Sequence, residues 1–404
     1  MNIWRSLRGL PRDLWILSLA SLINRAGTMV LPFLVLYLTR EKGFSAPRAG
    51  LTLAVYGMGS ILAGPLAGRL SDRIGPLPIM RWSLILTGVL LLVYPLVDGF
   101  PAIVAVTLAW AIVTEAFRPA NLALITDIVT PEQRKPAFAL TRLAINLGMS
   151  VGPAAAGFIA AASFSMIFVV DALTTIIAAI VLFLAPLSSV RHSSPASEPD
   201  AVAPVRGLFA LDDRRFLFFL GALFLTGIVF FQHEGALPLF LVEDLSLSPA
   251  FYGLLFTINT LMIVFMEVPL NAATAHWPHR RGLALGAFLF AAGSGVFVFA
   301  TGAELVILGI VVWTFGEMML FPQASAYVAD IAPAHRRGEY MGAYSLSFSL
   351  AFAFAPWAGT AIFAELGSIV LWTAVFVVGC LSAAMMLQVT AEPAIEAVPR
   401  NVHS

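Results

Sequence analysis

The fold of this chain is decided by a short charged stretch, Gly68-Arg69-Leu70-Ser71-Asp72-Arg73-Ile74-Gly75, which separates two long apolar runs at 47–68 and 79–97. A helix needs about 20 apolar residues to cross the ~30 Å hydrocarbon core of a bilayer, so each run is long enough to span a membrane. The charged stretch is therefore predicted to be a tight loop at the membrane surface. Its two arginines favour the cytoplasmic side, because short cytoplasmic loops concentrate Lys and Arg.

The composition predicts an integral membrane protein. Of the 404 residues, 59% are hydrophobic and 11% are charged, whereas soluble proteins average about 25% charged residues. Lys plus Arg and Asp plus Glu both number 23, and no basic run is present, so no nucleic-acid partner is expected. The single cysteine, Cys380, excludes an internal disulfide, and no spacing indicates a metal site or a cofactor.

Pro, Gly and charged residues divide the chain into twelve apolar segments. The first is too long for the core of a signal peptide and is expected to remain as a helix. The sequence thus predicts an all-α membrane protein with twelve transmembrane helices. The expected spans are 14–39, 47–68, 79–97, 101–129, 136–162, 164–186, 216–242, 249–275, 282–302, 304–332, 338–363 and 368–389.

The distribution of basic residues supports twelve spans with both termini in the cytoplasm. The predicted outer loops hold Arg40, Lys42 and Arg48, and three further arginines fall inside spans. We therefore expect a multi-pass protein of the cell (cytoplasmic, or inner) membrane. The predicted cytoplasmic segments hold 17 basic residues, namely Arg5, Arg8, Arg12, Arg69, Arg73, Arg81, Arg134, Lys135, Arg191, Arg206, Arg214, Arg215, Arg280, Arg281, Arg336, Arg337 and Arg400.

The two halves of the chain repeat each other. The repeat predicts two pseudo-symmetric six-helix bundles, residues 1–186 and 212–404, joined by a polar cytoplasmic linker at 187–211. Transporters built from such repeats place the substrate site between the halves, near the midplane. The matched positions are Trp110, Pro119, Asp127 and Pro153 with Trp313, Pro322, Asp330 and Pro356, then Leu31-Pro32-Phe33 with Leu237-Pro238-Leu239, and Pro47 and Gly50 with Pro249 and Gly253.

Three motifs resemble those of the major facilitator superfamily. Gly68-x3-Asp72-Arg73-x-Gly75 resembles its loop between helices 2 and 3, and Pro119-x7-Asp127 with the following Pro131-Glu132-Gln133-Arg134 resembles the end of its helix 4. Gly148-x3-Gly152-Pro153-x3-Gly157 resembles the helix 5 motif of its drug:proton antiporter branch. One departure is Thr107, which stands where these antiporters commonly have a basic residue. The resemblance implies the fold of the superfamily and transport by alternating access.

The resemblance also implies a role for the first motif. Gly68, Asp72, Arg73 and Gly75 are expected to form a latch that holds the halves together in the outward-facing state. Asp72 suits this role, because a carboxylate can accept hydrogen bonds from the amino end of a neighbouring helix. The ordinary alternative is a solvated turn.

The helix 5 motif has a similar double interpretation. Gly148, Gly152, Pro153 and Gly157 have the spacing of close helix packing. The resemblance adds that this helix lies between the halves, where a bend could serve the rocking motion or prevent leakage.

Polar and ionisable residues inside the spans are the candidates for coupling and substrate binding, because a buried charge costs at least ~2.5–3.5 kcal/mol. Glu115 and Arg118 share one helix face and could pair, or Arg25 could reach Glu115. Glu317 lies close to the repeat equivalent of Glu115, so each half brings a carboxylate to the midplane. The candidates are Asn24, Arg25, Glu115, Arg118, Gln232, His233, Glu234, Glu267 and Glu317.

Structural roles remain open for several of these residues. The pair of Glu115 and Arg118 could fix only the packing of the bundle, and Glu234 beside His233 could be a hydrogen-bonded helix contact. A histidine titrates near neutral pH, which suits a proton carrier. Asp171 is not a candidate, because it lies in the outer third of its span, and Arg142 is expected to snorkel to the membrane surface.

The sequence favours a proton-coupled exporter of small lipophilic or cationic compounds. Five embedded acids outnumber the two deep arginines, so at least one acid is expected to be protonated in some state. Uptake of a metabolite, peptide or organic anion bound by Arg25 and Arg118 is an alternative, as are a lipid-handling flippase and a membrane sensor. An enzyme is not expected, because no catalytic motif is present. We expect a monomer whose partners are its small-molecule substrate, protons and membrane lipid.

Overall fold

The computed structural model describes residues 9–130, 133–187, 213–333 and 336–390. Twelve helical segments of this part are long and apolar enough to cross a membrane, and the same part contains no strand. The expected all-helical fold with twelve spans is therefore confirmed. The linker predicted at 187–211 lies outside the described residues except for Leu187, so the domain boundaries stay a prediction. Arg5, Arg8, Arg191, Arg206 and Arg400 also lie outside them, as does the side chain of Lys135.

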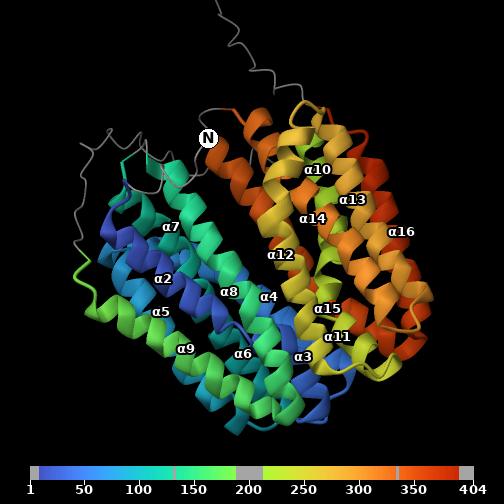
Figure 1. The fold of residues 1–404 in the computed structure, drawn as a ribbon, viewed down its shortest axis with the longest axis horizontal. Coiled ribbons are helices and arrows are strands. Elements are labelled where there is room, and N and C mark those ends of the chain that lie inside the picture. Colours follow the sequence, from blue (N-terminus) through green and yellow to red (C-terminus); the bar gives the residue numbers. More distant parts are fainter. Residues whose placement is uncertain (1–8, 131–132, 188–212, 334–335, 391–404) are drawn as a thin grey trace, which may run out of the picture.

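The first six spans form one bundle (Figure 1, blue to green). Two of the spans are interrupted, each by a short turn between two helices. The helices are α2 (Arg12–Ala26), α3 (Val30–Arg40), α4 (Ala46–Ile74), α5 (Pro76–Val93) with a 3₁₀ turn η1 (Tyr94–Leu96), α6 (Phe100–Glu115), α7 (Phe117–Ile128), α8 (Arg134–Ala162) and α9 (Phe164–Leu184).

The last six spans form the second bundle (Figure 1, yellow to red). Its first span is broken into several short pieces. The helices are α10 (Arg214–Phe230), a 3₁₀ turn η4 (Phe231–His233), α11 (Leu237–Leu239), a π-helical turn η5 (Phe240–Asp244), α12 (Pro249–Thr274), α13 (His279–Val296), a 3₁₀ turn η6 (Phe297–Phe299), α14 (Ala303–Ile331), α15 (Arg337–Leu366) and α16 (Ser368–Met386).

Both ends of the described chain lie on one side of the molecule, because the number of spans is even. We call the side where α2 begins the terminal side, and the side where α3 ends the far side. The described basic residues that were predicted to be cytoplasmic lie at helix ends or loops of the terminal side. They are Arg12, Arg69, Arg73, Arg81, Arg134, Arg214, Arg215, Arg280, Arg281, Arg336 and Arg337.

The charged stretch before Gly75 is helical and not a loop, which corrects the sequence interpretation. α4 continues to Ile74, and Gly75 alone separates it from α5. Gly75 has a φ of 86°, a conformation that glycine adopts without steric cost. Pro76 then suits the first turn of α5, where its missing N–H is not needed.

The first span of each half is broken at a matched position. α2 and α3 are separated just before Leu31-Pro32, and η4 and α11 are separated just before Leu237-Pro238. The hydroxyl of Tyr252 lies within hydrogen-bonding distance of the carbonyl oxygens of His233 (2.9 Å) and Pro32 (3.2 Å). One side chain therefore joins the broken spans of the two halves.

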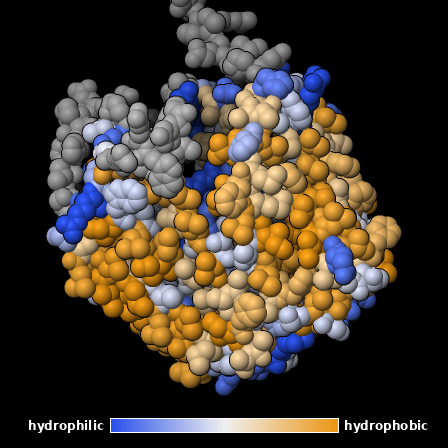
Figure 2. Space-filling view, viewed as in Figure 1, coloured by the Kyte–Doolittle hydropathy of each residue, from blue (hydrophilic) through white to orange (hydrophobic). Residues whose placement is uncertain are grey.

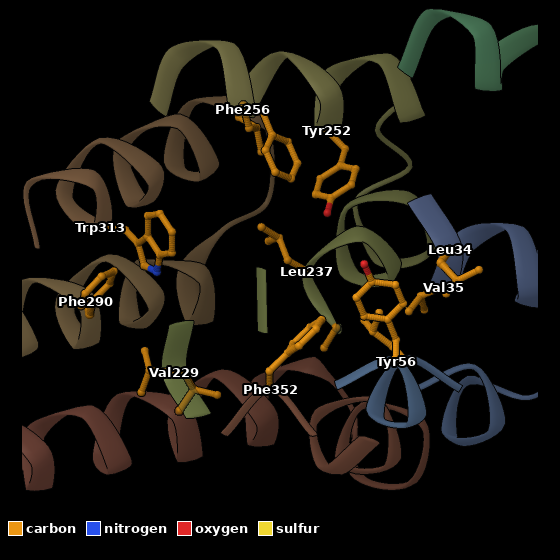
Figure 3. Packing of buried hydrophobic residues seen from close by; sticks show 14 of the residues in the cluster. Leu34, Val35, Tyr56, Val229, Leu237, Tyr252, Phe256, Phe290, Trp313 and Phe352 are labelled. Atoms are coloured by element: carbon orange, nitrogen blue, oxygen red, sulfur yellow. The ribbon is translucent and has the colours of Figure 1, made fainter. Parts of the chain in front are cut away.

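The halves meet closely on the far side, at two contacts related by the repeat. A Cβ on Gly50 would lie 2.6 Å from the carbonyl oxygen of Pro356, and a Cβ on Gly253 would clash with that of Pro153. Tyr56 and Phe352 continue this contact toward the midplane, with ring centroids 6.0 Å apart (Figure 3). Glycine is required at these positions because two helix backbones touch.

The halves separate on the terminal side. An added Cβ would have no atom within 4 Å at Gly64 or Gly68 on α4, or at Gly338 or Gly342 on α15. Figure 2 shows a recess there whose walls include hydrophilic residues, while the surrounding surface is largely hydrophobic. The structure is therefore closed on the far side and open on the terminal side.

Candidate functional site

A cavity of about 670 Å³ lies between the halves. α3, α4, α6 and α7 supply its walls from the first half, and α10, η4 with the turn after it, α14 and α15 supply them from the second. Its lining combines aromatic rings with three charged side chains. The lining residues are Leu31, Tyr56, Ser60, Gly64, Glu115, Arg118, Pro119, Leu122, Phe230, Phe231, Glu234, Phe321, Tyr344, Ser345, Phe348, Ser349 and Phe352.

Glu115 is held from the neighbouring helix α4. The hydroxyl of Tyr56 donates a hydrogen bond to Oε1 of Glu115 at 3.0 Å. The ring of Tyr56 is itself buried and packs edge-on against Trp110 at 4.8 Å. This packing positions the hydroxyl, so the carboxylate has a defined place in the cavity wall.

The expected ion pairs of Glu115 are absent from the described part of the chain. Glu115 pairs with neither Arg118 nor Arg25. Ala116 between α6 and α7 has helical backbone angles (φ −65°, ψ −24°), and Glu115 and Arg118 both line the cavity, so they lie on one side of the span without forming an ion pair. Arg118 is left exposed and lines the cavity.

Glu234 enters the same cavity from the second half. It follows η4 in the turn that breaks the first span of that half. The carboxylates of Glu115 and Glu234 are close enough for their charges to interact. Two acids from opposite halves therefore face one cavity.

Gln232 and His233 are directed into the second bundle, away from the cavity. His233 stacks on Trp313 at 5.1 Å and meets Phe256 at 4.5 Å. The amide of Gln232 donates to the carbonyl oxygens of Ile228 and Ala355. The predicted combination of His233 with Glu234 is thus divided between two environments, because consecutive residues of a helical turn point in different directions.

Glu317 and Glu267 form a second polar cluster, between α8, α12 and α14. Asn259 donates to Oε2 of Glu317 at 2.7 Å. Arg142 forms an ion pair with Glu267 across the two halves. The side chain of Arg142 is 62% exposed, so the expectation that it snorkels stays a prediction. Its partner could not be found from the sequence because it lies 125 positions away.

Asn24 supports the break in the first span. Its side-chain oxygen lies 3.5 Å from the hydroxyl of Thr175. Asp171 on the same helix, α9, accepts hydrogen bonds from the backbone N–H groups of Met29 and Val30, each at 3.0 Å. These two N–H groups begin α3, so the carboxylate caps it. Asn24 lies at a structural junction and does not line the cavity.

Comparison with known proteins decides the family. The family model of the Major Facilitator Superfamily matches residues 15–244 and 233–400. The chain belongs to the major facilitator superfamily. It is accordingly a transporter and not an enzyme.

Curated relatives cover most of the chain. The uncharacterized MFS-type transporter YqjV of Bacillus subtilis (strain 168) is 26% identical over 89% of this chain and 87% of its own. A Na(+), Li(+), K(+)/H(+) antiporter of Planococcus maritimus is 22% identical over 83% and 85%. The multidrug resistance protein MdtH of Aeromonas salmonicida (strain A449) is 24% identical over 83% and 84%.

A solved structure supports the same fold. A bacterial homologue of the human lysosomal transporter Spinster, in an inward-facing and occupied conformation, superposes with a TM-score of 0.76. It shares 13% identity and covers 93% of this chain and 96% of its own.

The latch expected of this superfamily is not engaged in the conformation described. Asp72 is exposed and makes no hydrogen bond or ion pair with another described residue. Gly68, another residue of the expected latch, has open space around it. The terminal side is open here, so the residues that a latch would join are apart, and the latch stays a prediction.

The helix 5 motif lies on α8, the fifth span, and contacts two neighbouring helices, α2 and α12. Gly148 and Gly152 lie against α2, where an added Cβ on either glycine would be 2.8 Å from a backbone atom of Ala26. Gly157 lies against the start of α12 in the other half. The motif therefore packs the first bundle internally and joins it to the second.

An aromatic stripe in the cavity was missed by the sequence analysis. Tyr344, Phe348 and Phe352 line the cavity at four-residue spacing on α15. Such spacing places side chains on one helix face, so the stripe was detectable. A membrane helix is apolar on all faces, however, and the pattern does not say whether the stripe meets lipid or a cavity.

Proposed function

We propose that this transporter is a proton-coupled exporter that exchanges protons for small lipophilic or cationic compounds. One observation carries the proposal: an aromatic-lined cavity receives Glu115 from one half and Glu234 from the other. Aromatic rings bind apolar groups and attract cations through their faces. Carboxylates bind either a cation or a proton.

Competition for the same carboxylates provides the exchange. Glu115 and Glu234 repel each other when both are charged, and either a proton or a bound cation relieves the repulsion. Occupation by one excludes the other, which is the requirement for antiport. With the terminal side in the cytoplasm, as the basic residues predict, the open cavity would load its compound from inside the cell.

The names of two relatives agree with parts of this proposal. One is a cation/proton antiporter and one is a multidrug resistance protein. The first name states exchange of cations for protons, in agreement with the proposed antiport.

Proton flux in proteoliposomes that contain a pH-sensitive dye tests the proposal. Lipophilic cations should induce proton movement in the wild type, and Glu115→Gln or Glu234→Gln should reduce it at least about tenfold, which corresponds to ~1.4 kcal/mol. Glu365→Gln, an exposed acid at the end of α15, is the matched control and should transport normally. Unchanged proton flux in both cavity variants would show that neither Glu115 nor Glu234 carries the proton.

Arg118 favours a second candidate function, the uptake of an organic anion or a peptide. Its guanidinium is exposed in the cavity and has no ion-pair partner among the described residues. Guanidinium groups bind carboxylates in a bidentate manner. If this candidate holds, carboxylate-containing compounds and not cations will drive proton flux, and Arg118→Gln will abolish it.

A further inference from the structure

A second hollow lies on the membrane-facing surface of the first bundle, outside the cavity between the halves. It has a volume of about 350 Å³ and is bordered by α4, α5 and the end of α6. Leu66, Leu70, Trp82 and Leu86 on its walls are 46–58% exposed. Ser83 contributes a hydroxyl, which already donates to the carbonyl of Val113 at 2.8 Å. The groove is therefore apolar along its length.

The length of the groove matches one leaflet of a bilayer. It runs along α4 from Ala63 to Ile74, a distance of roughly 16 Å at 1.5 Å per residue. Half of a ~30 Å hydrocarbon core is about the same length. Because the groove begins near the terminal-side end of α4 and stops near the midplane, a chain that entered it would lie in the terminal-side leaflet.

The part of α4 beside the groove presents leucine side chains that the protein leaves uncovered, because Leu66 is 52% and Leu70 is 46% exposed. Ser60 and Gly64 face the cavity between the halves, whereas Ala63 and Ala67 face the groove. Pro65 interrupts the hydrogen bonds of the helix in this stretch. An occupant of the groove would supply packing that this segment of the cavity wall lacks.

Positive charge lies at the terminal-side end of the groove. Arg73 follows Leu66 by seven residues and Leu70 by three, so it shares their helix face. Arg69 lies one turn earlier. Both arginines are exposed, and neither pairs with an acid in the described part of the chain. A negatively charged headgroup would complement this end, and such headgroups gather in the cytoplasmic leaflet.

We propose that this groove binds one acyl chain of an anionic phospholipid, with the lipid phosphate against Arg73 and Arg69. The acyl chain packs along Leu66, Leu70 and Trp82 and supports α4 from the membrane side. The site is separate from the cavity between the halves and does not depend on the identity of the transported compound.

Photo-crosslinking in nanodiscs tests the site. Phosphatidylglycerol with a diazirine on one acyl chain is added in trace amounts, and labelled residues are located by mass spectrometry. Label should concentrate on Leu66, Leu70 and Trp82 and should exceed that from the matching phosphatidylcholine several-fold. Leu70→Trp fills the groove and should reduce this label at least fivefold, while Leu173→Trp, at an equally exposed leucine of α9, should not. Leu66→Trp serves as a second filling variant.

The charged end is tested by Arg69→Gln/Arg73→Gln, or by Arg73→Gln alone if the double variant does not fold. Either change should bring labelling by phosphatidylglycerol down to the level of phosphatidylcholine. The proposal is overturned if label spreads over all lipid-facing helices in proportion to their exposure and Leu70→Trp leaves it unchanged. Equal labelling by the two lipids in the wild type would overturn the assignment to an anionic lipid.

Discussion

Glu115 shows how one hydrogen bond defines the position of an embedded acid. Its carboxylate meets the hydroxyl of Tyr56 at 3.0 Å, and the ring of Tyr56 is fixed by Trp110 and Phe352. The tyrosine is thus a positioning residue for the acid. Its effect should be visible in transport and not only in stability.

We predict that Tyr56→Phe lowers proton-coupled transport about tenfold, because the loss of a hydrogen bond to a charged group costs ~1.5–3 kcal/mol. Tyr94→Phe is a matched control. Tyr94 is equally buried, but its hydroxyl meets Thr107 and lies outside the cavity. Proteoliposome flux assays should separate the two variants, and equal loss in both would show that Tyr56 acts only through stability.

Asp171 is the other acid whose role follows from its hydrogen bonds. We predict that Asp171→Ala reduces the free energy of unfolding by about 1–3 kcal/mol for each of the two backbone N–H groups it leaves unpaired. Asp98→Ala removes an exposed carboxylate that pairs with Lys42 and should cost no more than ~1 kcal/mol. Thermal unfolding in detergent measures both, and equal melting temperatures would contradict the capping role.

At the scale of elements, the repeat places a glycine of one half against a proline of the other. Gly50 meets Pro356 and Gly253 meets Pro153. The two glycines are repeat equivalents 203 positions apart, and so are the two prolines. The two contacts are therefore symmetric parts of one far-side closure. Their close approach is possible only without a side chain.

We predict that Gly253→Val moves the conformational equilibrium away from the state described here, since its side chain would collide with the backbone at Pro153. With Cys380 replaced by serine, a cysteine at Ser349 in the cavity reports on opening of the terminal side. Its labelling by a maleimide should slow several-fold. Gly221→Val, at a glycine where an added Cβ would make only an ordinary contact of 3.7 Å with Met385, should leave the labelling rate unchanged.

At the scale of the whole molecule, twelve spans and the positions of the basic residues predict the orientation in the membrane. We predict that a cysteine at Asp98 on the far side reacts with an impermeant maleimide in intact cells. A cysteine at His276, between α12 and α13, should react only after permeabilisation. Both sites are exposed, so access from one side of the membrane is what differs. The reverse pattern would invert the proposed direction of transport.

The conformation of the whole molecule combines tight far-side contacts with an open terminal side. Arg142 and Glu267 nevertheless join the halves through α8 and α12. The cavity opens along α4, α14 and α15, away from this pair. The two seams between the halves therefore differ, and the one carrying Glu115 and Glu234 is the more open.

The sequence by itself determined the twelve spans, the two-fold repeat and the family. These features depend on the hydrophobic length of each segment and on local residue spacing, and each segment meets these requirements independently of the others. The candidate acids were also visible, because an ionisable residue in an apolar run is conspicuous at any position. The turn predicted between the second and third spans lies at Gly75, although the charged residues before it are helical.

Tertiary structure alone decided which of these residues act together. Glu115 and Glu234 share a cavity, whereas His233 beside Glu234 faces a different environment. Arg118 lines the cavity without its expected partner, and Arg142 pairs with an acid of the other half. The physical reason is that pairing between spans depends on helix rotation and on how the two bundles meet. Neither can be predicted from hydrophobic periodicity when the helices are apolar on every face.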